Sequence, residues 1–176
     1  MELTEKIKGS IRDVNNFPKE GIVFKDITPI MLDPILSNEI VQALAERYKH
    51  ANLQGIAGIE SRGFLFGFPL AMALGIPFIM IRKQGKLPYE KISHAYDLEY
   101  GSAVIEMHSD AFAPGDRILI HDDLLATGGS AAAAAALIQT CQGVVAGFDF
   151  MVELQFLEGR KKLKTYSDNI SNLVQY

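Results

Sequence analysis

Apolar residues recur along the chain at two spacings, which predict helices alternating with strands. A helical period at the start predicts a short amphipathic helix, whose apolar positions are Leu3, Ile7, Ile11 and Val14. A capping aspartate followed by proline, Asp33-Pro34, predicts a second helix that runs to about residue 51. Between the two helices we expect an extended, turn-rich segment over residues 22–30.

Short continuous apolar runs further along the chain predict buried strands. We expect these strands at residues 55–59, 76–81, 117–121 and 143–154, with helices between them at residues 63–74 and 128–142. Strands of this kind that alternate with helices form a mostly parallel sheet covered on both faces. The predicted fold class is therefore α/β, with a mostly parallel central sheet flanked by helices.

Two segments depart from this pattern. Residues 82–101 are polar, basic and without a helical period, which is typical of a functional lid or a disordered loop. Alternation of apolar or aromatic with acidic residues at 96–100 predicts that this segment ends as a strand paired with residues 102–107. The tail from Glu158 is polar, and the sequence leaves open whether it is ordered after Lys164.

Length and charge narrow the classes of function. With 176 residues and no break in composition, the chain suits a single domain over residues 1–176. Its net charge of -4 argues against a general nucleic-acid binder but allows one small polyanion to bind at a locally basic site. No apolar run approaches the ~20 residues of a membrane span, and residues 1–12 lack the apolar core of a signal peptide. We therefore expect a cytoplasmic protein without a membrane or nucleic-acid partner.

The strongest chemical signal is a turn of small residues between the predicted strand at 117–121 and the helix that follows it. Ligands bind at this edge of the sheet in parallel α/β folds. Accessible backbone N–H groups, two hydroxyl groups and a helix N-terminus would together bind a phosphate monoester. The residues that supply these groups are Thr127, Gly128, Gly129 and Ser130.

Two carboxylates, Asp122 and Asp123, precede this turn. They would repel a phosphate, so they need another partner. Ribose hydroxyls and a magnesium ion are the candidates, because hard cations take oxygen ligands. The alternative is a tight strand-to-helix turn, capped by Thr127, with solvated acids.

The stretch from Arg117 to Ser130 resembles the motif of type I phosphoribosyltransferases that binds 5-phosphoribosyl-1-pyrophosphate (PRPP). Its Asp-Asp-Leu-Leu-Ala-Thr-Gly-Gly core is the form seen in adenine phosphoribosyltransferases. The resemblance implies that residues 126–130, beginning with Ala126, hold the 5′-phosphate. It also implies that Asp122 and Asp123 hold the ribose hydroxyls and, directly or indirectly, Mg²⁺. His121 stands where the family usually has an aliphatic residue, and we interpret it as a strand-end side chain rather than a ligand.

Residues 17–29 resemble the N-terminal hood of the same family, which we place at about residues 1–33. The resemblance implies that Phe24 stacks on the base, that backbone groups of Val23 read its edge, and that Lys25 lies beside it. An aromatic face suits a purine, which binds by offset stacking. The alternative is that Phe24 is simply part of the core.

Two further segments resemble parts of the family that handle pyrophosphate. Residues 60–64 resemble its pyrophosphate loop, which often contains a strained or cis peptide, and Arg62 would contact the diphosphate there. Without the resemblance, Arg62 could equally be a surface residue. Residues 82–88 resemble the start of a flexible catalytic loop over about residues 83–101. This segment carries three cations, Arg82, Lys83 and Lys86. They would suit a leaving group with several negative charges, and the alternative is that they form a solvated basic loop.

The end of that loop also matches the family. The resemblance implies that Glu99 is the general acid or base at the purine ring nitrogen and that Tyr100 helps to order the loop. Acid–base help of this kind contributes ~10²–10⁴-fold.

The reaction implied by the resemblance is a step of purine salvage in which adenine and PRPP give AMP and pyrophosphate, with Mg²⁺ as cofactor. A homodimer is also implied, and the apolar residues at 64–68 give it some independent support. Two rival functions stay open. One is a phosphoribosyltransferase for an oxopurine, which Lys25 keeps open because such sites commonly use a lysine at the 6-oxo group. The other is a PRPP-sensing regulator that keeps the fold without catalysis.

Overall fold

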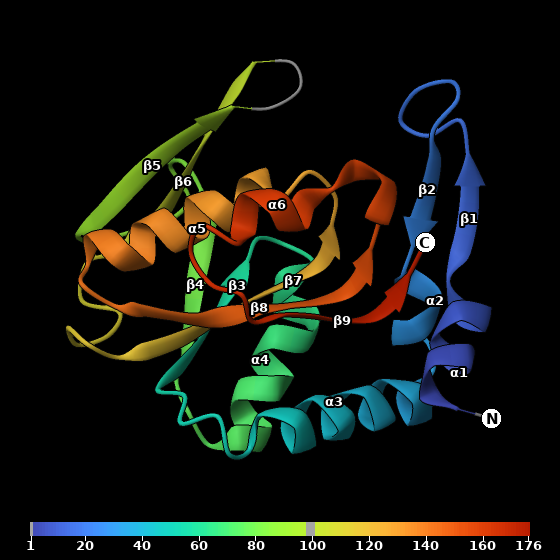
Figure 1. The fold of residues 1–176 in the computed structure, drawn as a ribbon, viewed down its shortest axis with the longest axis horizontal. Helices are drawn as coiled ribbons and strands as arrows, with labels where there is room; N and C mark the ends of the chain where they lie inside the picture. Colours follow the sequence, from blue (N-terminus) through green and yellow to red (C-terminus); the bar gives the residue numbers. More distant parts are fainter. Residues whose placement is uncertain (1, 98–100) are drawn as a thin grey trace.

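A seven-stranded sheet forms the centre of the computed structural model, which describes residues 2–97 and 101–176 (Figure 1). Its strand order is β5-β6-β4-β3-β7-β8-β9. Neighbouring strands from β4 to β9 pair in parallel, while β5 and β6 form an antiparallel hairpin at one edge. The strands are β3 (Gly55–Ile59), β4 (Phe78–Lys83), β5 (Lys91–Asp97), β6 (Ser102–His108), β7 (Arg117–Leu125), β8 (Val144–Glu153) and β9 (Ile170–Gln175). The mostly parallel α/β fold predicted from the apolar runs is confirmed.

Helices cover both faces of this sheet (Figure 1). On one face, α5 packs against the strands, and five consecutive alanines of this helix, residues 131–135, are buried, because small side chains let a helix lie close to its neighbours. On the other face, α1, α3 and α4 enclose a second apolar cluster. The helices are α1 (Leu3–Ser10), α2 (Thr28–Met31), α3 (Pro34–Tyr48), α4 (Gly63–Leu74), α5 (Gly129–Thr140) and α6 (Gly159–Leu163), with a 3-10 turn at Gln155–Leu157.

The N-terminal region differs from the prediction. The first helix ends at Ser10 instead of continuing through Val14, because the chain becomes extended at Ile11. Strand β1 (Arg12–Asn15) then pairs antiparallel with β2 (Val23–Asp26), so that Val14 lies opposite Phe24. A β-branched valine suits a strand better than a helix. We call β1 and β2 the hood hairpin, and they stand apart from the central sheet (Figure 1).

Other differences lie at strand boundaries. Strand β7 does not end at residue 121 but continues to Leu125 and carries both aspartates inside it. Strand β4 extends to Lys83. The predicted pairing with residues 102–107 is confirmed, although β5 occupies residues 91–97 and begins earlier than the alternation indicated. Part of the predicted loop is therefore a strand.

The polar tail is ordered and joins the sheet. Strand β9 lies beside β8 at the edge and buries only Ile170 and Val174 of its six residues. With so few apolar positions, its sequence pattern is too weak to predict a strand. No helix in the described part of the chain is long and apolar enough to cross a membrane.

Candidate active site

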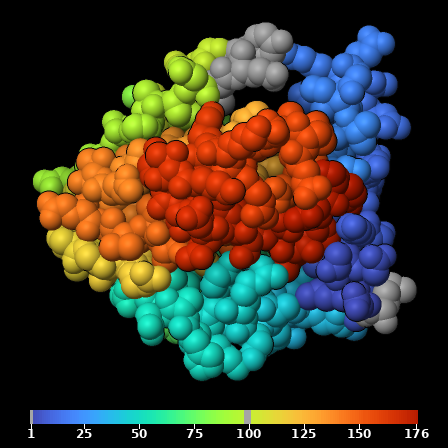
Figure 2. Space-filling model, viewed as in Figure 1, coloured from blue at the N-terminus to red at the C-terminus, as the bar shows by residue number. Residues whose placement is uncertain are grey.

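A cavity of about 520 Å³ opens at the carboxyl ends of β3, β4 and β7, the edge at which ligands bind in such sheets. Figure 2 shows the hood hairpin (blue) at the upper right of the molecule and the β5–β6 hairpin (light green) at the upper left. The sequence predicted seven of the lining residues as site residues, and they come from three separate segments of the chain. They are Arg62, Lys83, Lys86, Asp122, Asp123, Ala126 and Ser130.

The acid pair, Asp122 and Asp123, lies at the end of β7 inside this cavity. Arg62 Nε lies 3.0 Å from Asp123 Oδ2, and the Asp123 amide donates to Asp122 Oδ1 at 2.9 Å. Burial and then the neighbouring Asp123 raise the pKa of Asp122 well above its ordinary value. Burial also raises the pKa of Asp123, although Arg62 acts in the opposite direction. Two carboxylates held this close in a cavity indicate a functional site.

A close approach of α4 to β7 brings Arg62 to the acid pair. A Cβ atom on Gly63, the first residue of α4, would lie 2.8 Å from the His121 carbonyl oxygen and 3.0 Å from Asp122 Oδ1. Only glycine therefore allows the helix to begin against the end of the strand. The loop before it, which contains a cis peptide between Glu60 and Ser61, as the family resemblance implied, is held over the cavity.

The phosphate loop, residues 126–130, joins β7 to α5. Gly128 has φ +78°, a backbone conformation that favours glycine, and it directly precedes the first residue of α5. Ala126 and Ser130 line the cavity, whereas Thr127, which is exposed, and the two glycines do not. The structure thus brings the predicted loop to the cavity but does not place every one of its residues in the wall.

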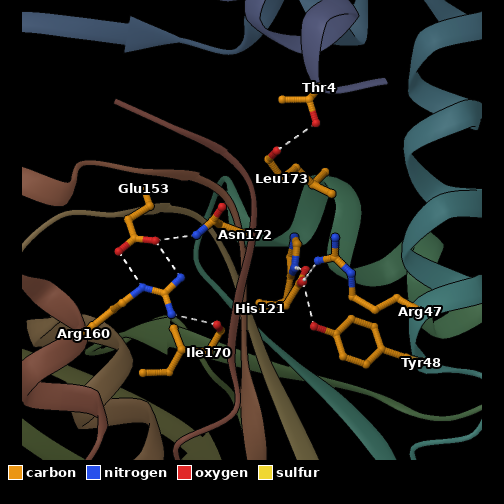
Figure 3. A network of polar contacts seen from close by, with 10 residues as sticks. Thr4, Arg47, Tyr48, His121, Glu153, Arg160, Ile170, Asn172 and Leu173 are labelled. Atoms are coloured by element: carbon orange, nitrogen blue, oxygen red, sulfur yellow. Dashed lines mark hydrogen bonds and ion pairs between the residues drawn. The ribbon is translucent and has the colours of Figure 1, made fainter. Parts of the chain in front are cut away.

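Support for the phosphate loop comes from α6, which the sequence analysis missed. A Cβ on Gly159 would lie 2.3 Å from the Ala126 carbonyl oxygen, so the two segments are in contact. Arg160 holds α6 in place through two parallel bonds of 2.7 Å to Glu153 and one of 2.9 Å to the Ile170 carbonyl (Figure 3). No local sequence signal could have revealed this contact, because the two segments are far apart along the chain.

Two of the three predicted cations, Arg82 and Lys86, contact one carboxylate, and Lys83 contacts it through its backbone amide. Glu60 accepts from Arg82 Nε at 3.1 Å, from the Lys83 amide at 3.1 Å and from Lys86 Nζ. Burial alone would raise the pKa of Glu60, but the bonds from Lys86, Lys83 and Arg82 outweigh it and lower the pKa. Glu60 therefore stays ionised and fixes the side chains of Arg82 and Lys86. Arg82 lies beside the cavity rather than in its lining.

Phe24 on the hood hairpin does not line the cavity itself but contacts Arg62, which does. The Arg62 guanidinium lies 5.1 Å from the centre of the Phe24 ring, and Phe17 packs edge-on against that ring at 5.2 Å. Phe24 is half-buried and lies outside both core clusters, so the alternative that it is a core residue is wrong. Val23 is 46% exposed and does not line the cavity.

Lys25 points to other partners. Its Nζ lies 2.7 Å from Asp13 Oδ1 and 3.9 Å from the centre of the Tyr176 ring. The structure therefore does not bring Lys25 to the cavity. Glu99 and Tyr100 lie outside the described residues. Tyr96 on β5 lines the cavity, which the sequence analysis missed although it had noted the alternation around it.

His121 is fully buried within β7 and does not line the cavity. This placement agrees with its interpretation as something other than a ligand.

Comparisons with known proteins agree with this geometry. No protein-family model matches the chain. The adenine phosphoribosyltransferase of Cytophaga hutchinsonii is 49% identical over 174 residues, which cover 99% of this chain and 96% of that protein. The crystal structure of the Thermoanaerobacter pseudethanolicus enzyme is 47% identical, has a TM-score of 0.94 and is matched over 98% of this chain and 99% of its own.

A third relative is the adenine phosphoribosyltransferase of Saccharomyces cerevisiae, solved in complex with adenine and an imino-altritol bisphosphate. It is 40% identical with a TM-score of 0.91, and the match covers 97% of this chain and 98% of that one. Identity of this level over nearly the full length of each protein goes together with the same arrangement of strands and helices. The chain belongs to the adenine phosphoribosyltransferase family.

Proposed function

We propose that the cavity binds PRPP and adenine and transfers the 5-phosphoribosyl group to the base, giving AMP and pyrophosphate in purine salvage. The observation that carries this proposal is the meeting of three features in one place. The acid pair, the Arg62 side chain and the Phe24 ring lie in sequence-distant segments, yet Arg62 contacts both of the others. Such a site presents groups for a ribose, an anion and an aromatic base side by side.

Each part of PRPP has a complementary group. The phosphate loop offers backbone N–H groups and the N-terminus of α5 to the 5′-phosphate. Asp122 and Asp123 accept hydrogen bonds from the ribose hydroxyls. Arg62, Lys83 and Lys86 in the cavity, together with Arg82 at its rim, receive the pyrophosphate, whose negative charges they offset. Pyrophosphate would compete with Glu60 for Arg82 and Lys86.

Magnesium fits this site as an ion shared with the substrate. Among residues 2–97 and 101–176 no group of three or more His, Cys, Asp or Glu side chains could hold a metal ion alone. Mg²⁺ usually keeps several waters and binds through one or two carboxylates plus substrate phosphates. Asp122 and Asp123 are hard oxygen donors that suit this arrangement, either directly or through the ribose hydroxyls. When bound, the ion would offset charge on the pyrophosphate.

The hood hairpin supplies the base site. Phe24 stacks on adenine, and backbone groups near Val23 form hydrogen bonds to its edge. Because Lys25 is engaged by Asp13 and Tyr176, it is not free to contact a 6-oxo group, which favours adenine over an oxopurine. We assign Lys25 to holding the hairpin beside the base site.

The chemistry follows from these positions. The bond between C1′ and pyrophosphate loosens before the base nitrogen arrives, and the departing negative charge is met by Arg62, Lys83 and Lys86. Enclosure of the cavity excludes water, which would hydrolyse the activated sugar. Glu99 would manage the proton on adenine and Tyr100 would order the loop, and both roles rest on the family resemblance. The segment over about residues 83–101 would act as the lid.

The proposal also covers the domain organisation, cellular location and oligomeric state of the protein. We infer one cytoplasmic domain over residues 1–176 that forms a homodimer. An apolar stripe on α4 supports the dimer, because Leu65, Phe68 and Met72 are 41%, 51% and 66% exposed on one side of the helix. The mass of the protein in solution tests this part.

The activity is tested by following pyrophosphate release from PRPP and magnesium with adenine, hypoxanthine, guanine and xanthine in parallel. Release with adenine alone would support both the reaction and the base. Release only with an oxopurine would overturn the role of the hood hairpin while keeping the PRPP site. Binding of PRPP without release with any base would favour the sensing regulator.

A further inference from the structure

A buried polar cluster joins β7, β8 and α3 (Figure 3). His121 on β7 and Asp149 on β8 occupy paired positions of neighbouring strands and are both fully buried. His121 Nδ1 lies 2.8 Å from Asp149 Oδ2. On its other oxygen, Asp149 accepts from the Tyr48 hydroxyl at 2.8 Å and from Arg47 Nη1 at 3.3 Å.

Burial of this polar cluster in the core costs free energy. The residues around it on the same face are apolar, and an apolar pair in its place would avoid the desolvation of a carboxylate. It is also incomplete, since His121 Nε2 is buried and has no hydrogen-bond partner among the described residues. Stability alone therefore does not account for the choice of histidine at this position.

The hydrogen bond fixes the orientation of the imidazole. An ionised carboxylate only accepts, so Nδ1 carries the proton and donates to Asp149. Bonds to a charged partner are short and strongly directional. Asp149 is itself fixed from α3 by Tyr48 and Arg47. A leucine at position 121 would fill a similar volume but would lack any such constraint.

His121 lies where two parts of the active site meet. It directly precedes the acid pair, and its carbonyl oxygen lies against Gly63. Its ring lies against Gly67, one turn further along α4, where an added Cβ would be 3.3 Å from His121 Cδ2. Because α4 begins directly after Arg62, the imidazole sets the spacing between the helix that presents Arg62 and the strand that presents the acid pair.

We propose that His121, held by Asp149, is a positioning residue that sets the acid pair against Arg62 for PRPP binding. This proposal rests on the proposed function of the same cavity. His121 does not touch the substrate. Its contribution is to fix the end of β7 relative to the start of α4, and it should therefore affect PRPP rather than adenine.

The test compares two substitutions of the same residue. His121→Leu removes the Nδ1–H donor, and we expect kcat/KM for PRPP to fall by about tenfold to a hundredfold, the range for a small misplacement of reacting groups. His121→Asn places an amide donor near the position of Nδ1 and should recover most of this loss. KM for adenine should stay within about twofold in both variants, because the hood hairpin is not in contact with the cluster.

Two further variants separate positioning from stability. Tyr48→Phe removes one of the two bonds to Asp149 Oδ1, while Arg47 still holds Asp149 and the bond to His121 remains, so the variant should lower the unfolding temperature while PRPP kinetics stay within about twofold. Asp149→Asn weakens the hydrogen bond to His121 by removing the charge of the acceptor, while the side chain at position 149 keeps its shape. If His121→Leu does not fold, a fall in kcat/KM for PRPP of about threefold or more in Asp149→Asn reports the same bond.

The outcomes that overturn the proposal are distinct from failure of the proposed function. Wild-type PRPP kinetics in a folded His121→Leu or Asp149→Asn variant, or an equal loss in His121→Leu and His121→Asn, would overturn positioning. Absence of turnover with adenine in the wild-type protein would instead overturn the function. In that case calorimetric binding of PRPP to the same variants still decides the role of His121.

Discussion

The two sides of the cavity are built in different ways. On the side proposed to bind PRPP, the acid pair and the phosphate loop are locked by close contacts between backbone segments, at Gly63 against β7 and at Gly159 against Ala126. On the side proposed to bind adenine, a two-stranded hairpin is joined to the rest of the protein by side-chain contacts such as those of Phe24 and Lys25. Changes on the PRPP side should therefore alter stability and PRPP binding together, whereas changes in the hood hairpin should alter adenine binding alone.

The largest effect is expected at the acid pair. Asp122→Asn keeps the shape of the side chain but removes its charge, so the ribose hydroxyls lose a charged acceptor. Hydrogen bonds to charged groups contribute ~1.5–3 kcal/mol, so kcat/KM for PRPP should fall roughly a hundredfold. Steady-state kinetics at varied PRPP measure this. A loss confined to KM for adenine would contradict the assignment of Asp122 to PRPP.

The same variant should be more stable than the wild type at neutral pH. The pKa of Asp122 is raised in the folded protein, first by burial and then by Asp123. The Asp122 carboxyl is therefore most favourable to stability below about pH 4, which is the pKa of an aspartate in the unfolded chain. This advantage is lost as the pH rises through the pKa of Asp122 in the folded protein. Asparagine has no such penalty. The gain in unfolding temperature of Asp122→Asn should be largest near pH 7 and disappear toward pH 4.

A change behind the phosphate loop should affect stability and substrate binding together. In Gly159→Ala, the new methyl group would lie 2.3 Å from the Ala126 carbonyl oxygen and 3.1 Å from the Gly128 nitrogen, so the backbone must shift. Overpacking of this kind costs about 1–3 kcal/mol of unfolding free energy. We also expect KM for PRPP to rise about tenfold, because displacement of a binding group by ~1 Å is costly. Denaturant unfolding and kinetics measure the two effects.

Gly9→Ala is the matched control for that substitution. Gly9 lies in α1, and no atom within 4 Å would meet an added Cβ. Because alanine favours helices, the variant should be more stable by about 0.5–1 kcal/mol with unchanged kinetics. An equal rise in KM for PRPP in both variants would show that the contact between Gly159 and Ala126 does not shape the loop.

The sequence predicted the fold best where the signal is local. The apolar run at residues 55–59 and the helix at residues 63–74 match β3 and α4. Asp33 caps α3 as expected, through bonds to the amides of Ile35 and Leu36. Strands β1 and β9 were missed because their stability comes from pairing with distant segments, and each has few apolar residues. Non-local pairing leaves little trace in the pattern of one segment.

The site shows the same division. The phosphate loop and Arg62 could be predicted because each belongs to a short motif whose residues serve one purpose. Glu60 and Gly159 could not, because their roles arise from contacts with Arg82 and Ala126, which are far away in the chain. Lys25 was assigned to the base from its position in a motif, yet its environment is set by Asp13 and Tyr176. Motifs thus identify residues at the cavity better than the residues that hold them in place.

The contrast between the two sides is sharpened by Phe24→Ala. Loss of the ring should raise KM for adenine about tenfold, since stacking of a base on an aromatic side chain contributes ~1–3 kcal/mol. KM for PRPP should stay within about twofold, and the unfolding temperature should change little because the ring is half-buried in a peripheral hairpin. A matching rise in both Michaelis constants would indicate that the two sides of the cavity are coupled.

The smallest effect is expected at Lys25. Lys25→Met keeps the apolar stem but removes the ion pair with Asp13 and the cation–π contact with Tyr176. Asp13 is about half exposed, so solvent screens the ion pair, and each contact contributes at most about 1 kcal/mol. We expect a slightly lower unfolding temperature and a change in KM for adenine of about twofold. Asp13→Asn removes the other partner of the same ion pair and should change the unfolding temperature and KM for adenine to the same extent. If Lys25→Met raised KM for adenine about tenfold while Asp13→Asn did not, Lys25 would contact the base directly, and the hood hairpin would recognise its ligand through a charged side chain.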